Sequence, residues 1–381
     1  MNIPAEFDEI RPYTPEELPQ VFEELIADPM FCAVIKAVIP NVPEEMLFMK
    51  LRQCKTNLDV QKAFFYGLLH DILKKYSDGF DLDASALKKG TNYTFISNHR
   101  DIILDSGFLS VGLIDEGFDN TVEIAIGDNL LIYPWIKKLV RINKAFIVQR
   151  SVSMRQMLVS SARMSKYMHF AINDKKENLW IAQREGRAKD SNDRTQDSVL
   201  KMLAMGGEGD IVDRLKDLNI VPLSLSYEFD PCDFLKAQEM QQKRDIEGFK
   251  KSQDDDLNNM KTGIFGYKGR IHFQAGECIN DALEELRGMP KTEIFHKVAE
   301  LIDYSIHKNY RLYPGNYIAW DMLEGNSSHT DQYTEEDKAR FMKYLESKLA
   351  LIQLPNKDNE FLTNCMLTMY ANPAKNHTTA L

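Results

Sequence analysis

Cysteine is scarce in this chain of 381 residues, and its spacing argues against two kinds of site. The five cysteines are odd in number and scattered, and no Cys-x-x-Cys pair occurs. A disulfide framework and a cysteine zinc site are therefore not expected. The pattern is typical of a protein that folds in a reducing cytoplasm. The cysteines are Cys32, Cys54, Cys232, Cys278 and Cys365.

Long apolar runs and a signal peptide are also missing. No stretch approaches the roughly 18 apolar residues that a membrane-spanning helix needs. Residues Met1–Arg11 carry acidic side chains and no apolar core, unlike a signal peptide. We therefore expect a cytoplasmic protein whose contact with the inner face of the membrane is peripheral.

Positive charge is in deficit overall but is concentrated in one tract. The net charge is −10, which does not favour a nucleic-acid partner. Between Lys137 and Arg187, however, there are twelve Lys or Arg residues and three Asp or Glu residues. Such a tract in an acidic protein indicates an anionic ligand or surface. A solvated, salt-bridged face explains the charge equally well, and charge alone does not decide.

Short apolar runs between helical stretches predict an α/β fold with a largely parallel sheet flanked by helices. Helical periodicity dominates before these runs, over Glu16–Ile26 and Pro43–Lys74, and again after about Gly288. The six runs that read as buried strands are Tyr93–Ser97, Val122–Ile126, Ala145–Gln149, Leu179–Ala182, Ile220–Tyr227 and Arg270–Gln274.

The same pattern divides the chain into three regions. We expect an N-terminal helical region over 1–88, an α/β domain over 89–288, and a C-terminal helical extension over 289–381. Thr334 followed by Asp337 predicts a helix start, and the residues from about Asn372 look frayed. The charged segment between Phe234 and Met260 reads as a helical insertion that either covers a site or lies in solvent, and we favour the second.

The sharpest chemical signal is the segment that ends the first predicted strand of the α/β domain. His99 follows Asn98 in the turn before a helix, and Asp101 and Asp105 come soon after. Ligands in open α/β sheets bind at the C-terminal ends of the strands. A histidine there, oriented by a carboxylate, has the parts of a general base. Taken alone, such a histidine more often caps a helix or satisfies a turn.

Three further segments follow in order and carry a family resemblance. They are Lys144-Ala-Phe-Ile-Val-Gln-Arg150, Trp180-Ile-Ala-Gln-Arg-Glu-Gly-Arg187 and the Val-Pro strand that begins at Ile220. Together with Asn98-His99-Arg100 they resemble the four blocks of the glycerolipid acyltransferases, the enzymes that acylate glycerol 3-phosphate and 1-acylglycerol 3-phosphate. The resemblance spans roughly Tyr93 to Cys278.

The chain departs from the family pattern in three blocks. The family has four residues between its His and Asp, whereas five separate His99 from Asp105. Either the turn absorbs the extra residue, which we favour, or Asp101 takes the role. Lys144 stands where glycine is usual, and Glu185-Gly186 is followed directly by Arg187, one residue early. These changes suggest a divergent subfamily with an unusual acceptor.

The resemblance implies direct acyl transfer without an acyl-enzyme. His99 would take the proton of the acceptor hydroxyl, and Asp105 would hold His99. The acceptor's anionic group would be bound by a set of family positions, since arginine meets phosphate or carboxylate in two parallel hydrogen bonds. The donor would be acyl carrier protein or a coenzyme A thioester, with no cofactor and no metal. The acceptor-binding positions are Arg150, Glu185, Gly186, Arg187 and Lys189.

Several alternatives stay open at this stage. The acceptor could be an amino-acid lipid, which offers a carboxylate to the same arginines. The protein could be an inactive homologue that binds lipid or carrier, as the longer His-to-Asp spacing would suggest. A hydrolase is disfavoured because no Gly-x-Ser-x-Gly elbow occurs. The segment Asn129–Ile142, with Trp135 among apolar and basic residues, fits either an interfacial element on anionic lipid or a core helix.

Overall fold

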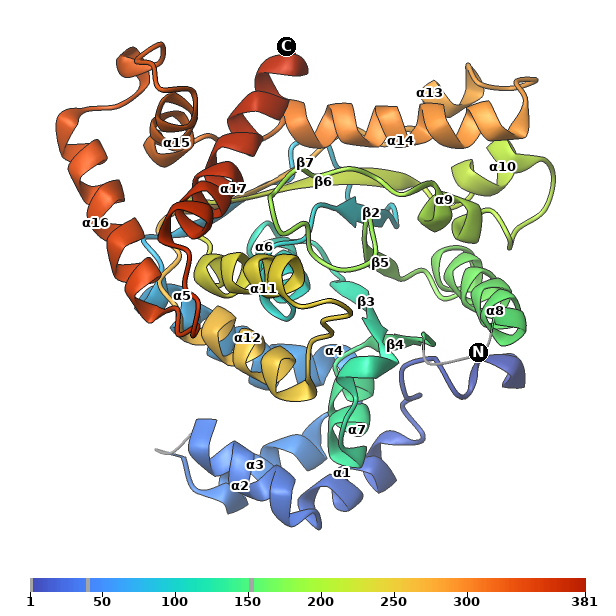
Figure 1. The fold of residues 1–381 in the computed structure, drawn as a ribbon. Coiled ribbons are helices and arrows are strands. Elements are labelled where there is room, and N and C mark those ends of the chain that lie inside the picture. The colour runs from blue at the N-terminus through green and yellow to red at the C-terminus, as the bar shows by residue number, and fades with distance from the viewer. Residues whose placement is uncertain (1–2, 39–41, 151–153) are drawn as a thin grey trace.

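The computed structural model describes residues 3–38, 42–150 and 154–381. Seven strands form one mixed sheet in the order β1-β7-β6-β2-β5-β3-β4 (Figure 1). Strands β6, β2, β5, β3 and β4 are parallel, whereas β7 is antiparallel to β6 and parallel to β1. The predicted α/β fold is therefore confirmed. The strands are β1 (Phe80–Asp83), β2 (Thr94–Ser97), β3 (Val122–Gly127), β4 (Ala145–Val148), β5 (Asn178–Ala182), β6 (Ile220–Tyr227) and β7 (Ile271–Ala275).

All six predicted strands are present, and none of their ends differs by more than one residue. Their side chains alternate between two buried faces, as expected for a sheet covered on both sides. Phe95 and Trp180 pack with one set of helices, whereas Ile96 and Leu179 pack with the other. This double burial explains why the runs are mostly apolar.

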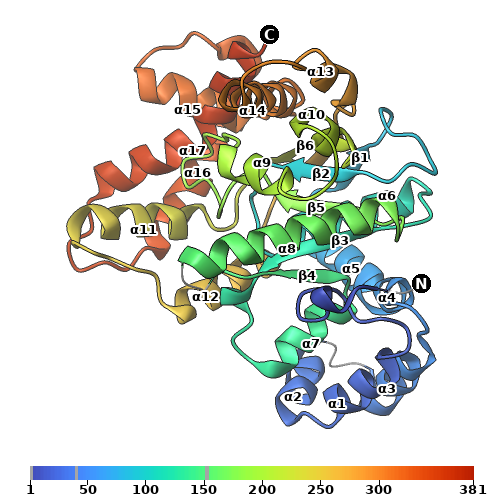
Figure 2. The same cartoon turned by 90° about the vertical axis from the view of Figure 1, so that its right-hand side faces the viewer.

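Helices cover the two faces unequally. One face packs against α5 (Tyr66–Tyr76) and α6 (Leu104–Asp115). The other packs against a larger set, and Figure 2 shows its longest member, α8, lying in front of β3 and β5. That set is α8 (Met154–Asn173), α9 (Asp197–Leu203), α10 (Ile211–Lys216), α13 (Asn280–Glu284) and α14 (Lys291–Lys308).

The first strand was not predicted. β1 is four residues long, lies at the sheet edge, and alternates Asp81 and Asp83 with apolar residues. It precedes residue 89, so the sheet begins within the region that the sequence assigned to N-terminal helices. A short edge strand buries little apolar surface, and its periodicity is correspondingly weak.

The N-terminal helices form a separate apolar cluster with α7 (Pro134–Ile142), at the bottom of Figure 1. Trp135 of α7 is 9% exposed and lies 6.2 Å from Phe31, ring centre to ring centre. The apolar face of α7 is thus covered, as expected for a core helix and not for an interfacial one. The cluster contains α1 (Leu18–Ile26), α2 (Pro29–Val38), α3 (Glu44–Gln53) and α4 (Asn57–Val60), and a π turn, η2 (Gln61–Phe65), leads on to α5.

The C-terminal helices after α14 build a further cluster together with α11 (Asp233–Asp245). Thr334 caps its helix in a capping box with Asp337, which confirms the predicted start. The predicted fraying from Asn372 is wrong, because α17 continues to Thr379 and the Asn372 amide donates to the carbonyl of Asp190 at 2.8 Å. The helices are α15 (Pro314–Glu324), α16 (Glu335–Leu351) and α17 (Asn359–Thr379).

The prediction that the charged insertion lies in solvent is also wrong. The insertion forms α11 and α12 (Gln253–Phe265), and the charged inner face of α11 is buried. Lys236 is fully buried and pairs with Asp230, and Glu239 is 5% exposed. These charges tolerate burial because each has an ionic partner. Within the described ranges, no helix is both long and apolar enough to cross a membrane.

Candidate active site

The turn that follows β2 is held by its neighbours on both sides. The backbone N–H of Gln183 donates to the Ser97 carbonyl at 2.8 Å, which extends the pairing with β5. On the other side, the Asn98 amide donates to the Leu225 carbonyl at 2.9 Å and accepts from the Leu225 N–H at 2.8 Å. The side chain of Asn98 thereby replaces a strand residue in pairing with β6. The direction in which His99 leaves the sheet is set by these bonds.

His99 and Asp105 meet at the C-terminal end of β2. His99 Nδ1 lies 2.8 Å from Asp105 Oδ2, and the Asp105 side chain is fully buried in the first turn of α6. Because a carboxylate is an acceptor, this contact leaves Nδ1 as the protonated nitrogen and Nε2 with its lone pair. In the described part of the chain, no residue hydrogen bonds to Nε2.

Asp105 is itself held by three other donors. Its Oδ2 accepts the backbone N–H groups of Arg100 at 2.7 Å and Asp101 at 3.1 Å. Its Oδ1 accepts the hydroxyl of Tyr227 at 3.0 Å. The ring of Trp180 stands edge-on to the imidazole, with centres 5.5 Å apart. The sequence did not single out Tyr227 or Trp180 for roles, although both lie in the resembling blocks.

Asp101 has a different position. Its Oδ1 accepts the N–H groups of Ile103 at 2.9 Å and Leu104 at 2.8 Å, where α6 begins. Burial, together with the charge of Asp105, raises the pKa of Asp101. Asp101 therefore caps the helix, and the turn absorbs the extra residue between His99 and Asp105.

The predicted acceptor-binding residues fall into two groups. Arg150, 39% exposed, lies 3.7 Å from Glu185, so these two side chains bridge the turns after β4 and β5. Gly186 between the groups has a φ of +68°, a left-handed conformation that favours glycine. Arg187 and Lys189 turn instead toward the insertion. The structure thus does not gather all five residues around one point.

Arg187 and Lys189 are bound by the two inserted helices. Arg187 Nη2 donates to Asn259 Oδ1 of α12 at 2.9 Å, and Lys189 Nζ lies 2.7 Å from Glu239 of α11. Burial, reinforced by the charge of Arg187, lowers the pKa of Lys189 to about 8. Burial works against ionisation of Glu239, but hydrogen bonds from Lys189 and Lys243 outweigh it and lower that pKa to about 2. No sequence signal pointed to Asn259, since it lies in a segment with no recognisable motif.

The surroundings of Lys144 explain why a lysine stands at the glycine position of the second block. Its φ is +61°, in the left-handed region that glycine adopts most readily. The ammonium group is buried and bonds Glu177 at 2.6 Å and Asn120 at 2.7 Å. Lys144 is therefore part of a polar cluster that precedes β4 and does not belong to the turns around His99.

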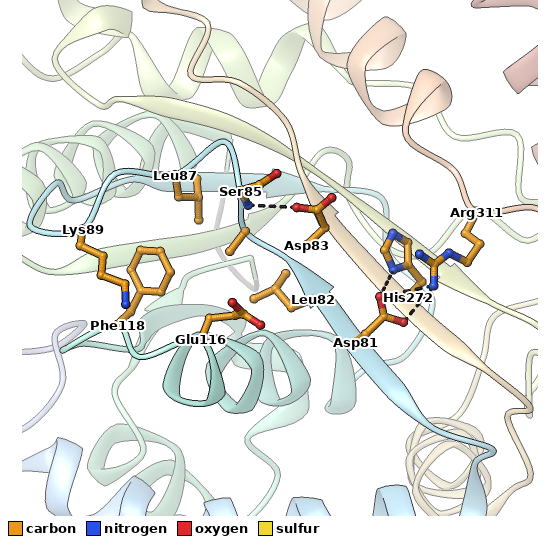
Figure 3. A pocket seen from close by; sticks show the side chains of 11 residues that line it. Asp81, Leu82, Asp83, Ser85, Leu87, Lys89, Glu116, Phe118, His272 and Arg311 are labelled. Carbon is orange, nitrogen blue, oxygen red and sulfur yellow. Dashed lines mark hydrogen bonds and ion pairs between the residues drawn. The ribbon is translucent and has the colours of Figure 1, made fainter.

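A second His–Asp pair lies in a surface pocket of about 540 Å³ at the edge of the sheet (Figure 3). There His272 Nδ1 lies 2.6 Å from Asp81 Oδ2, and Arg311 bonds the same carboxylate at 3.0 Å. Asp81 is 56% exposed, in contrast to the fully buried Asp105. Neither His272 nor Asp81 lies in any of the four sequence blocks described above. His99 and Asp105 remain the better candidates.

Comparisons with known proteins add little to this description. No family model matches the sequence, and no curated protein matches it. Among solved structures, a 1-acyl-sn-glycerophosphate acyltransferase from Thermotoga maritima is similar, with 11% identical residues and a TM-score of 0.35. The match covers 76% of this chain and 98% of that one. A similarity of this size does not establish a family or an activity.

Proposed function

We propose that the protein is an acyltransferase of phospholipid biosynthesis. It moves a fatty acyl chain from the thioester of acyl carrier protein or coenzyme A to a hydroxyl of glycerol 3-phosphate or 1-acylglycerol 3-phosphate. The observation that carries the proposal is the contact of His99 with the buried Asp105 at the C-terminal end of β2. The order of the four sequence blocks supports it independently.

The proposed reaction needs one base and no covalent enzyme intermediate. His99 Nε2 accepts the proton of the acceptor hydroxyl while the oxygen attacks the thioester carbonyl carbon. The ester C–O bond forms, the C–S bond breaks, and the proton passes to the departing thiolate. Asp105, itself held by Tyr227, keeps Nδ1 protonated and the ring in place.

The acceptor's charge is proposed to lie near Arg187, with Lys189 and Arg150 adding positive potential. An amino-acid lipid would offer a carboxylate to the same guanidinium, and planar Arg suits either anion. The longer His-to-Asp spacing was the best support for the inactive-homologue alternative. The 2.8 Å contact between His99 and Asp105 removes that support.

We also propose that the protein works at an anionic membrane surface. Ile103, Tyr133 and Leu158 are 41%, 39% and 66% exposed and lie on segments that follow β2, β3 and β4. Because parallel strands end at one edge of a sheet, these apolar side chains lie at the same edge as His99. Cosedimentation with phosphatidylglycerol vesicles tests this, and retention of the protein in the supernatant at low salt would contradict it.

The reaction is tested by acyl transfer from acyl carrier protein and from acyl-coenzyme A to a panel of acceptors. The panel contains glycerol 3-phosphate, its 1-acyl form and N-acyl amino acids. We expect product with one of them and a fall of about 10²- to 10⁴-fold in His99→Ala, the usual contribution of a general base. Absence of product with every acceptor would overturn the proposal.

A matched control is available within the chain. His329 Nδ1 lies 2.6 Å from Asp321 Oδ1 in the C-terminal helices, so it repeats the His–Asp contact away from β2. We expect His329→Ala to keep the transfer rate of the wild type. Equal losses in both variants would show that the assay responds to general damage.

A further inference from the structure

The connection between β6 and β7 is longer than the sheet requires. These strands are antiparallel neighbours, and such neighbours can be joined by a two-residue turn. Instead, α11 and α12 intervene and pack their polar inner faces against the turns that carry His99 and Arg187. The insertion therefore adds side chains to the candidate site.

Helix α12 approaches these turns closely. A Cβ atom on Gly263 would lie 1.9 Å from Asp101 Oδ2, so the helix backbone lies directly against that carboxylate. One turn earlier, Asn259 is 5% exposed, and its carbonyl accepts the Cys232 thiol at 3.3 Å. Its side chain accepts Arg187 Nη2 at 2.9 Å and donates to the Asp255 carbonyl at 2.8 Å. Hydrogen bonds thus hold both the backbone carbonyl and the side chain of Asn259.

The guanidinium of Arg187 also interacts with the Cys232 side chain, but its Nη1 has no hydrogen-bond partner among the described residues. The residue is 7% exposed, and Nη1 itself is buried. The side-chain amide of Gln183, four residues earlier, is 1% exposed and likewise lacks partners for both of its polar atoms in the described chain. Buried polar groups are normally satisfied, so Nη1 of Arg187 and the Gln183 amide are free to bond a ligand or an ordered water at this turn.

Two carboxylates lie near enough to act electrostatically on the same guanidinium. The charges of Asp101 and Asp230 both act on Arg187. Without Asn259, the fork would be free to turn toward either of them and away from an incoming anion. A neutral amide can hold Arg187 without cancelling its charge.

We infer that Asn259 is a positioning residue: it orients Arg187 so that Nη1 meets the anionic group of the acceptor. The inserted helices thereby complete the acceptor subsite, an inference that rests on the proposed acyl transfer for its substrate. The ligand class is a phosphate or carboxylate monoanion or dianion carried on the acceptor.

The first test separates acceptor binding from chemistry. In Asn259→Ala we expect the KM for the anionic acceptor to rise about tenfold, while kcat and the KM for the acyl donor change less than about twofold. The control is Asn258→Ala, because Asn258 is exposed on the same helix. If the alanine variant does not fold, Asn259→Ser repeats the test with a polar side chain too short to reach Nη2.

The second test asks whether Asn259 acts through Arg187. In an Arg187→Lys background, which keeps the charge and removes the fork, we expect Asn259→Ala to have no further effect on the acceptor KM. Independent, additive effects of the two substitutions would overturn the inference.

The third test does not depend on turnover. Isothermal titration with inorganic phosphate, and separately with acetate, measures anion binding to the wild type, Asn258→Ala and Asn259→Ala. We expect about tenfold weaker binding of the preferred anion in Asn259→Ala alone. Anion binding that depends on Asn259 without any acyl transfer would uphold the inference and sink the proposed function. Acyl transfer with an unchanged acceptor KM, or no binding of either anion by the wild type, would overturn the inference.

Discussion

Asp101 and Asp105 stand four residues apart, yet they bind different groups. Asp105 lies on the inner side of the first turn of α6 and reaches His99, whereas Asp101 lies ahead of the helix and bonds its first N–H groups. The sequence favoured Asp105 for the catalytic role and left Asp101 as the alternative. The structure separates them because the backbone N–H groups of Arg100 and Asp101 both point at Asp105.

This separation predicts unequal effects of two isosteric substitutions. Asp105→Asn replaces a carboxylate oxygen with an amide nitrogen, which cannot accept the hydrogen bonds that Asp105 receives. The imidazole tautomer protonated at Nδ1 is then disfavoured, so acyl transfer should fall by about 10²- to 10⁴-fold. Asp101→Asn keeps an oxygen for Ile103 and Leu104 and should change the rate less than about tenfold. Rates measured beside unfolding curves check this, and the reverse order would assign the role to Asp101.

A buried carboxylate at the start of α11 predicts a dependence of stability on pH. Asp233 accepts the hydroxyls of Tyr370 at 2.7 Å and Tyr344 at 2.9 Å, and burial raises its pKa to about 6. The unfolded chain therefore loses this proton first, so the stabilising contribution is complete below about pH 4 and is lost as pH rises through 6.

Asp233→Asn removes this titration and keeps a similar shape. As pH rises from 4 to 6, the free energy of unfolding of the wild type should fall relative to that of Asp233→Asn. Urea unfolding at several pH values measures it. A difference that stays flat across this range would mean that Asp233 is ionised throughout.

At the scale of elements, α12 is the piece whose place the sequence misjudged. Its acidic residues suggested solvent, yet the helix buries Asn259 and Gly263, and the preceding α11 buries Lys236 and Glu239. A helix can bury polar and charged groups when the surface it covers supplies partners for them. Arg187, which bonds Asn259 of α12, and Lys189, which bonds Glu239 of α11, belong to the turn after β5, far away in the sequence. Periodicity reports which face of a helix is apolar and cannot report such pairing.

Because α12 lies so close to Asp101, we expect a Gly-to-Ala substitution in this helix to lower stability, the opposite of the usual effect. Ala for Gly inside a helix usually stabilises by about 0.5–1 kcal/mol. Gly263→Ala should instead destabilise by about 1–3 kcal/mol, because its Cβ would collide with Asp101 Oδ2. Gly67→Ala is the control, since nothing lies within 4 Å of a Cβ at that helical position. Urea unfolding of both variants decides, and stabilisation by Gly263→Ala would show that α12 does not press on Asp101.

Across the whole molecule, the C-terminal region is divided between two cores. Val298, Ile302 and Ile306 of α14 belong to the same cluster as Ile96 and Ile220 of the sheet. The later helices α15, α16 and α17 pack instead with α11. Asp193 links the turn after β2 to the segment after α14, because it accepts Arg100 Nη1 at 3.0 Å and Nη2 at 2.6 Å and also the Tyr310 hydroxyl.

This arrangement predicts that the α/β region does not fold without α14. A chain that ends at residue 288 would expose one face of the sheet and leave Arg100 and Asp193 without their cover from Tyr310. We expect it to aggregate or to lack a cooperative unfolding transition, measured by circular dichroism against the full chain. A cooperative transition in the shortened chain would instead make residues 289–381 an independent extension.

The sequence by itself determined six of the seven strands, the α/β class, the start of α16 at Thr334, and His99 as the candidate general base. These features depend on local periodicity, capping and block order, all of which are readable along one chain. Tertiary structure alone decided which aspartate meets His99, that β1 joins the sheet, and that α11 and α12 cover Arg187. Each of those outcomes is a contact between residues distant in the sequence or a choice of turn geometry, and neither leaves a periodic trace.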